Sequence, residues 1–187
     1  MRAAVALLLL VALTGCGSAK TTATPTTSTS AGFVLTDRTP APSFLLPSET
    51  GQRVGPQTYR GHWLVVTFLY THCPDVCPLI ANRLAAAQRS DADLRVLAVS
   101  VDPKRDTRAA VRGFLRAHHA GPGFHYVNGT RPALARVWRR YHIASLPGPQ
   151  GTVSHSAFSV LVDPQGRERV LFDSQVTARQ VLAAIRS

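Results

Sequence analysis

A strand buried on both faces is predicted at residues 63–70, which read WLVVTFLY. The segment is almost continuously apolar and rich in β-branched and aromatic side chains. An alternating strand would leave one face to water, but this one carries apolar side chains on both faces. Such a strand belongs inside a sheet that is covered on both sides, and this narrows the fold to a layered α/β or all-β arrangement.

The rest of the chain alternates between strand and helix patterns. Strands are predicted at residues 94–101, 124–127, 158–162 and 169–172, and helices at 79–88, 106–119, 130–141 and 178–185. Thr130 and Thr177 are expected to cap the last two helices. A short hairpin is predicted from 44–46 and 52–54. The sequence therefore predicts an α/β fold, with a mixed sheet flanked by helices and an N-terminal β-hairpin.

The first 15 residues, MRAAVALLLLVALTG, have the pattern of an export signal. Arg2 precedes an apolar run at 3–13, which is too short for a bilayer span of ~20 residues but suits a signal peptide. Small residues then precede Cys16, an arrangement that resembles the bacterial lipobox. We expect residues 1–15 to be removed and Cys16 to carry the lipid. An ordinary secretory signal with an incidental cysteine is the alternative.

A tether is predicted after the signal. Residues 16–32 are rich in Ser and Thr and almost free of large apolar side chains, so they cannot bury enough surface to fold. From Phe33 onward the composition is typical of a folded domain, and residues 33–187 are expected to form one domain. These boundaries predict a protein held by lipid on the outer face of the cytoplasmic membrane. No other segment is apolar enough to cross a membrane.

The charge balance is basic, with 21 Lys and Arg against 10 Asp and Glu and a formal net charge of +11. Only Lys20 and Lys104 are lysines, so the excess is arginine. These residues are spread over the predicted helices without a nucleic-acid-binding motif. We expect no nucleic-acid partner, because attraction to an anionic membrane surface explains the charge as simply.

Two cysteines follow the buried strand directly, in Tyr-Thr-His-Cys-Pro-Asp-Val-Cys-Pro at 70–78. Cys73 and Cys77 share one face if the chain between them turns helically, with Pro74 in the first turn. The positive end of the helix would then favour a thiolate at Cys73. A thiolate in this setting attacks another sulfur or binds a soft metal ion such as Cu(I).

A histidine would complete a copper site that two sulfurs leave open. Of the seven histidines, His155 is the candidate, because it lies in a Gly- and Pro-rich loop that enters a predicted strand. Such a loop can reach another loop at the same edge of a sheet. His72 adjoins Cys73, but adjacent side chains of an extended turn point apart.

The motif at 70–78 closely resembles the signature of the Sco/SenC copper proteins. Two further segments agree in order: Val-Ser-Val-Asp-Pro-Lys-Arg-Asp-Thr at 99–107, and His155 followed by a strand and Asp-Pro-Gln-Gly at 163–166. The resemblance covers about residues 40–187. It implies a thioredoxin-like fold and one copper ion bound by Cys73, Cys77 and His155.

The resemblance also implies a function. Members of the family deliver copper to the dinuclear copper centre in subunit II of cytochrome c oxidase, or reduce its cysteines. The expected partners are therefore that subunit and either a thiol reductant or another copper carrier. Copper transfer by ligand exchange would make the protein a metallochaperone without turnover.

Other interpretations of the same residues stay open. Cys73 and Cys77 also suit a thiol–disulfide oxidoreductase or a thiol peroxidase, which would not need His155, and a structural disulfide is a third reading. Asp75 and Asp102 are candidates for residues behind the ligands. Asp75 is interpreted as a helix cap or a partner-recognition residue, and Asp102 as an aspartate that organises the turn at Pro103.

Overall fold

The computed structural model describes residues 28–29, 32–148 and 153–187. Its strands are β1 (Ser28–Thr29), β2 (Gly32–Val34), β3 (Leu46–Pro47), β4 (Arg53–Val54), β5 (Trp63–Leu69), β6 (Leu94–Ser100), β7 (Phe124–Val127), β8 (Ser145–Pro147), β9 (Val153–His155), β10 (Ser159–Val162) and β11 (Glu168–Phe172). Its helices are α1 (Val76–Ser90), α2 (Arg108–Ala117), α3 (Arg131–Arg140) and α4 (Ala178–Ile185), with a 3₁₀ turn at Pro56–Tyr59. This order confirms the predicted α/β class.

The central sheet has seven strands in the order β1-β2-β11-β10-β5-β6-β7. Strands β5, β6 and β7 run parallel, and β10, β11 and β2 continue the sheet with antiparallel pairing. From Leu64 onward β5 is buried throughout, as its continuous apolar sequence predicts. A strand with an apolar side chain on each face is stable only in the middle of a covered sheet.

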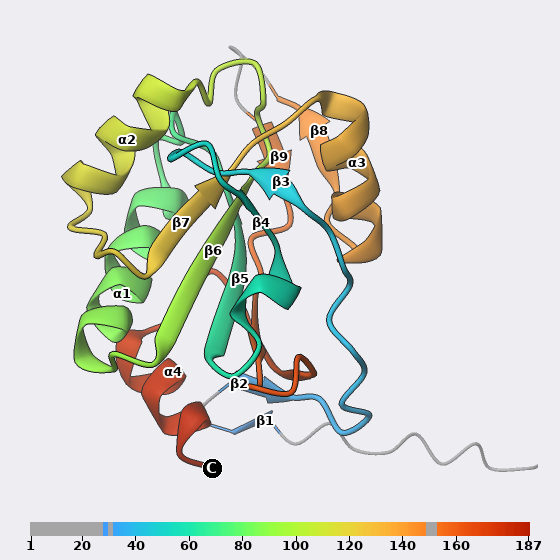
Figure 1. The fold of residues 1–187 in the computed structure, drawn as a ribbon, viewed down its shortest axis with the longest axis vertical. Coiled ribbons are helices and arrows are strands. Elements are labelled where there is room, and N and C mark those ends of the chain that lie inside the picture. Colours follow the sequence, from blue (N-terminus) through green and yellow to red (C-terminus); the bar gives the residue numbers. More distant parts are fainter. Residues whose placement is uncertain (1–27, 30–31, 149–152) are drawn as a thin grey trace, which may run out of the picture.

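The helices cover both faces of the sheet. Helices α1, α2 and α4 lie on one side, and α3 lies with the β3–β4 hairpin on the other (Figure 1). Tyr141 at the end of α3 packs its ring on Phe68 of β5, with centroids 5.3 Å apart. The Trp138 indole donates a hydrogen bond to the Ser100 carbonyl at the end of β6. These contacts fix α3 against the carboxyl ends of the parallel strands.

The helix boundaries follow the capping residues. Thr130 and Thr177 accept backbone N–H groups at the starts of α3 and α4, which confirms both predicted caps. Helix α2 is shorter than predicted, because Thr107 caps it and Asp106 lies in the preceding turn. A capping hydroxyl satisfies one of the free N–H groups of the first turn, so the helix begins after it.

The predicted N-terminal hairpin is present as β3 and β4, which pair Leu46 with Val54. The chain passes very close to itself beside this hairpin. A Cβ atom added at Gly55 would lie 1.8 Å from the Phe44 carbonyl oxygen, so only glycine fits there. The hairpin is therefore locked against the segment that leads into it.

The end of the predicted tether needs a correction. Ser28–Thr29 pair with β2, and β2, which starts at Gly32, pairs with β11. Sheet pairing uses backbone N–H and C=O groups, so a segment rich in Ser and Thr can join an open edge. Residues 1–27, which hold the predicted signal peptide, Cys16 and most of the tether, lie outside the described residues. Within the described part, no helix has the length and apolarity to cross a membrane.

Candidate metal centre

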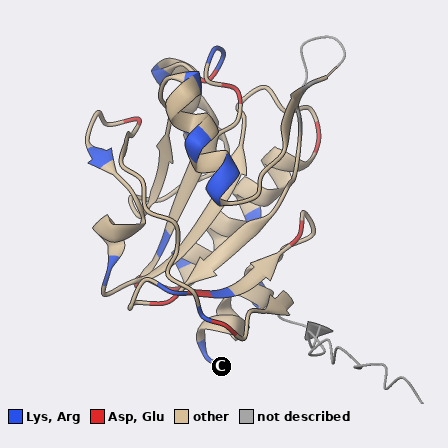
Figure 2. Ribbon diagram, turned by 90° about the vertical axis from the view of Figure 1, so that its right-hand side faces the viewer, with Lys and Arg blue, Asp and Glu red and all other residues tan. Residues whose placement is uncertain are grey.

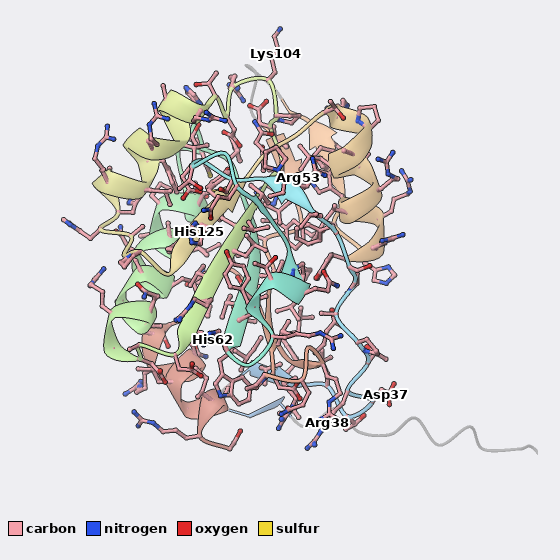
Figure 3. The ribbon with its side chains drawn as sticks, in the orientation of Figure 1. Asp37, Arg38, Arg53, His62, Lys104 and His125 are labelled. Carbon is pink, nitrogen blue, oxygen red and sulfur yellow. The ribbon has the colours of Figure 1, made fainter. Side chains whose placement is uncertain are left out.

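The loops that follow β5 and β6 meet at one edge of the sheet. The loop after β5 carries the two cysteines, and the loop after β6 runs from Asp102 to Thr107 and carries Lys104. Lys104 marks this edge at the top of Figure 3. Parallel strands bring their carboxyl ends to the same side, so residues far apart in sequence gather there.

Helix α1 begins later than the motif suggested. Asp75 occupies the N-cap position with a non-helical backbone, and the first helical residue is Val76. The prediction that Pro74 lies in the first turn is wrong, because the N-cap is Asp75 and the helix begins two residues after Pro74. Pro78 is the proline inside the first turn. Cys73 therefore lies before the helix, and Cys77 lies within its first turn.

Cys73 and Cys77 are both buried and are not joined by a disulfide. The Cys77 backbone N–H donates to the Cys73 sulfur over 3.4 Å. Hydrogen bonding from the Cys77 thiol, and from the backbone N–H groups of Asp75 and Cys77, holds the pKa of Cys73 well below its usual value. The same pairing with Cys73, followed by burial, raises the pKa of Cys77. The pair thus consists of a thiolate at Cys73 and a thiol at Cys77.

His155 approaches this pair from the end of β9. Its Nε2 atom lies 3.8 Å from the Cys77 sulfur. Its Nδ1 atom lies 3.1 Å from the Ser156 carbonyl oxygen, which can only accept, so Nδ1 carries the proton. Burial lowers the pKa of His155 and keeps the ring neutral. The free electron pair of Nε2 is therefore turned toward the cysteines, as a metal ligand requires.

Tyr70 forms one wall of the site. Its ring is buried and meets His155 edge-on, with centroids 5.8 Å apart. It follows β5 directly, so the same strand end that carries the cysteine loop also supports the histidine. Sequence reasoning placed Tyr70 in the motif but gave it no role.

The three candidate ligands are of chemical types that bind soft metal ions: one thiolate, one thiol and one neutral imidazole. Within residues 32–148 and 153–187, no three His, Cys, Asp or Glu side chains are already arranged to hold a metal ion. His155 contacts Cys77, and Cys77 contacts Cys73. For all three residues to bind one ion, His155 would have to lie within reach of both sulfurs.

Asp106 is the residue behind the site that sequence reasoning missed. Its side chain is buried, and its Oδ1 atom accepts both the backbone N–H and the hydroxyl of Thr71 at 2.8 Å. The Ser100 hydroxyl donates to Oδ2 over 2.5 Å, and the Tyr126 hydroxyl lies 2.8 Å from the same atom. A buried carboxyl group with this many donors is a structural anchor. It ties the cysteine loop after β5 to the ends of β6 and β7.

Asp106 could have been suspected from one signal. It lies one helical turn past the end of a buried strand, at the sheet edge that carries the cysteines, in an otherwise basic stretch. The sequence analysis instead places it at the start of the helix predicted at 106–119. The four donors that surround it come from the loop after β5 and from strands β6 and β7, and only the folded chain assembles them.

The two candidate aspartates have other roles. Asp102 pairs with Arg105, and its carbonyl accepts the Asp106 N–H, so it organises the turn at Pro103 as the simpler interpretation held. Asp75 holds the N-cap position of α1 as the cap interpretation expected, but its side chain is exposed and makes no capping hydrogen bond. It acts on Cys73 through its backbone N–H instead.

The other described histidines lie away from the cysteine pair or face solvent. His72 is exposed, with Nδ1 2.9 Å from the Thr71 hydroxyl. His62 pairs with Asp93 and His125 with Glu49, and Figure 3 shows both well below the edge marked by Lys104.

Residues 35–187 match the family model described as SCO1/SenC. The chain belongs to the SCO1/SenC family. The human protein named "Protein SCO1 homolog, mitochondrial" is 31% identical over 153 residues, which are 76% of this chain and 50% of the human protein. The SCO1/SenC chain described here thus spans about half the length of that relative.

Two solved structures extend the comparison. Arabidopsis thaliana ScoI with copper bound is 26% identical, with a TM-score of 0.70 over 78% of this chain and 96% of the other. Bradyrhizobium japonicum ScoI with copper bound is 28% identical, with a TM-score of 0.65 over 78% of this chain and 98% of the other. These likenesses confirm the thioredoxin-like fold that the motifs of this SCO1/SenC chain implied.

Proposed function

We propose that the protein binds one copper ion per chain through Cys73, Cys77 and His155. The observation that carries this proposal is the 3.8 Å approach of His155 Nε2 to the Cys77 sulfur, beside a Cys73 whose pKa is lowered. Soft sulfur favours Cu(I), and a neutral imidazole suits either copper oxidation state. Two SCO1/SenC relatives of similar fold carry copper in their structures.

Each ligand has a separate task in this proposal. Cys73 is already a thiolate and receives the ion first. Cys77 must give up its thiol proton to solvent as copper binds. Copper supplies the positive charge that makes the second thiolate stable in a buried place. Asp106 keeps the cysteine loop in position through Thr71.

We further propose that the bound copper serves the assembly of cytochrome c oxidase. The resemblance of the three motifs to the Sco/SenC proteins supports this role, with the dinuclear copper centre of subunit II as the receiving site. Copper is the cargo here and leaves by ligand exchange. The shallow burial of Cys73, with 9% of its surface exposed, supports transfer because an incoming ligand can reach this sulfur.

A thiol–disulfide role is the second candidate, and the unequal pKa values of the cysteines favour it. The Cys73 thiolate would attack a disulfide of the target protein and form a mixed disulfide. Cys77 would then attack Cys73, releasing the target as a dithiol and leaving Cys73 and Cys77 oxidised to a disulfide. A thiol reductant must restore the pair after each reaction.

Copper titration of the reduced protein separates these functions. We expect one copper ion per chain by metal analysis, with a sulfur-to-copper absorption band when Cu(II) is bound. Replacing either cysteine should abolish tight Cu(I) binding, and His155→Ala should weaken Cu(II) binding and change the band. His72→Ala is the matched control, since His72 adjoins Cys73 but is exposed. An unchanged band in His155→Ala would remove His155 from the ligand set.

We also propose that the protein is held on the outer face of the cytoplasmic membrane by lipid on Cys16. The apolar run at 3–13 and the small residues before Cys16 support this location. Two acyl chains anchor a protein stably, and a Ser- and Thr-rich segment of about fifteen residues would reach ~20 Å from the anchor.

A further inference from the structure

A groove of about 430 Å³ lies on the side of the molecule that carries α3. One wall is the segment that leads into β3, and the other is α3 itself. Phe44, Leu45 and Val137 give the groove apolar surface, and Leu45 is 50% exposed. The groove lies apart from the cysteine site and has no part in the proposed copper chemistry.

Three arginines line this groove: Arg53 from β4, and Arg136 and Arg140 from α3. All three are exposed. Arg53 donates to the Leu45 carbonyl and Arg140 to the Ser43 carbonyl, so both guanidinium groups are held against the groove wall. Helix α3 also carries Arg131 and Arg139 and has no acidic residue. Figure 2 shows its blue bands facing the viewer.

No carboxylate of the described residues forms an ion pair with these three arginines. Five of the ten acidic residues of the chain are engaged elsewhere. Those in ion pairs or in the buried network are Glu49, Asp93, Asp102, Asp106 and Asp163. Guanidinium groups that are oriented but lack an anion are ready to bind carboxylates in pairs of hydrogen bonds.

The segments at 1–31 and 149–152 cannot supply a carboxylate to these arginines. Residues 1–31 contain no Asp or Glu, and neither do residues 149–152. A second copy of the chain would bring its own net charge of +11 and be repelled. A flat bilayer surface would meet the rims of a concave groove and leave its apolar floor empty. The shape and charge together select a narrow anionic chain with apolar side chains.

We propose that this groove, between the segment 43–47 and α3, binds an acidic peptide segment of a partner protein. Apolar side chains of the segment enter between Leu45 and Val137, and its carboxylates pair with Arg53, Arg136 and Arg140. The groove is next to Gly129 and Thr130, which follow β7 at the edge that carries the cysteines. The groove thus reaches the sheet edge of the cysteine site without sharing its residues, so the groove supplies docking while the cysteines supply chemistry.

A display library of random short peptides tests this, with the purified full-length chain as bait. The test variant is Arg136→Glu with Arg140→Glu on α3. The matched control is Arg112→Glu with Arg116→Glu on α2, which has the same spacing and the same charge change on an exposed face. Arg136→Ala alone is the second variant, because the Arg136 side chain makes no hydrogen bond within the described residues. Copper binding of each variant is measured in parallel.

We expect the selected peptides to be rich in Asp, Glu and apolar residues. Their affinity should fall at least tenfold, or ~1.4 kcal/mol, in the α3 variant and stay near the wild-type value in the α2 control. Arg136→Ala should reduce it in the same direction. Copper binding should be unchanged in all of these variants. A failed peptide test therefore leaves the copper proposal standing, and a failed copper test leaves the peptide proposal standing.

Three outcomes would overturn the proposal. Equal loss of peptide affinity in the α2 and α3 variants would show attraction by net charge alone. Failure to select any peptide that distinguishes the wild type from the α3 variant would show that the groove has no peptide preference. If the α3 variant lost binding to vesicles of phosphatidylglycerol but kept its peptide binding, the arginines would belong to a membrane-binding surface instead.

Discussion

The Cys77 sulfur lies 3.8 Å from His155 Nε2, although 78 residues separate the two in the chain. The contact exists because the first turn of α1 and the end of β9 meet at the same sheet edge. Its chemistry depends on a second bond, in which Nδ1 donates to the Ser156 carbonyl and leaves Nε2 unprotonated. A half-buried, neutral histidine beside a thiolate–thiol pair distinguishes this site from a simple dithiol.

His155 should separate a copper role from a purely thiol-based role in cells. A strain lacking the gene and complemented with His155→Ala should stay low in cytochrome oxidase activity, and added copper should restore part of it by mass action. His72→Ala should complement fully. Normal oxidase activity with His155→Ala would favour a role based on the cysteines alone, and peroxide sensitivity of the deletion strain would then point to a thiol peroxidase.

The lowered pKa of Cys73 predicts a shifted pH profile for alkylation. Hydrogen bonds from Cys77 and the backbone lower this pKa from 9.0 to about 5. The rate of iodoacetamide labelling of the reduced protein should therefore be level near neutral pH and fall as the pH drops through about 5. In urea the same rate should instead fall below about pH 9. Cys73→Ser should label slowly, because Cys77 is fully buried, and burial still raises its pKa when the pairing with Cys73 is removed.

The same shift predicts how stability depends on pH. A group with a lowered pKa in the folded state stabilises it fully above the unfolded pKa and not at all below the folded one. The free energy of unfolding of the reduced protein should therefore rise between about pH 5 and pH 9. Cys73→Ser should flatten this rise in urea melts. An equally steep rise in that variant would assign the effect to other groups.

Removing the buried carboxyl group of Asp106 should destabilise the whole domain. Asp106→Ala removes the acceptor of buried donors from Thr71 and Ser100, which should cost ~3 to 5 kcal/mol in urea unfolding. Asp106→Asn keeps one acceptor oxygen and should cost less. Asp75→Ala is the control and should change stability little, since that side chain is exposed and makes no capping bond.

Two glycines should respond to alanine with opposite signs. Gly55→Ala places a methyl group on the Phe44 carbonyl oxygen and should destabilise the hairpin strongly. Gly113→Ala, inside α2 with open space around it, should stabilise by about 0.5 to 1 kcal/mol because alanine favours helix. Thermal unfolding of both variants checks the pair. A loss of stability in Gly113→Ala would mean that the space around it is filled in solution.

Intact-mass analysis of the membrane fraction should show a protein that begins at Cys16 and carries a diacyl adduct. The reason is the short apolar run followed by small residues at the cysteine. Cys16→Ser should release the protein from the membrane without unfolding residues 33–187. A mature protein that starts elsewhere and carries no lipid would contradict this.

Local sequence patterns predicted most of the helices and strands of the central sheet. The buried strand at 63–70, the caps at Thr130 and Thr177, and the last helix at 178–185 were predicted with the observed type and place. These features depend on side-chain periodicity and on bonds between neighbours, which the sequence states directly. The strands β1, β8 and β9 were not predicted, because their pairing uses the backbone and leaves little mark on composition.

The sequence by itself determined the donor set: two cysteines four residues apart after a buried strand, and a histidine in a loop that enters another strand. Only the tertiary structure decided which cysteine is the thiolate, how His155 is protonated, and that Asp106 anchors the cysteine loop. It also decided that Arg53, Arg136 and Arg140 line one groove. These properties depend on burial and on hydrogen bonds between distant segments, and no local pattern encodes either.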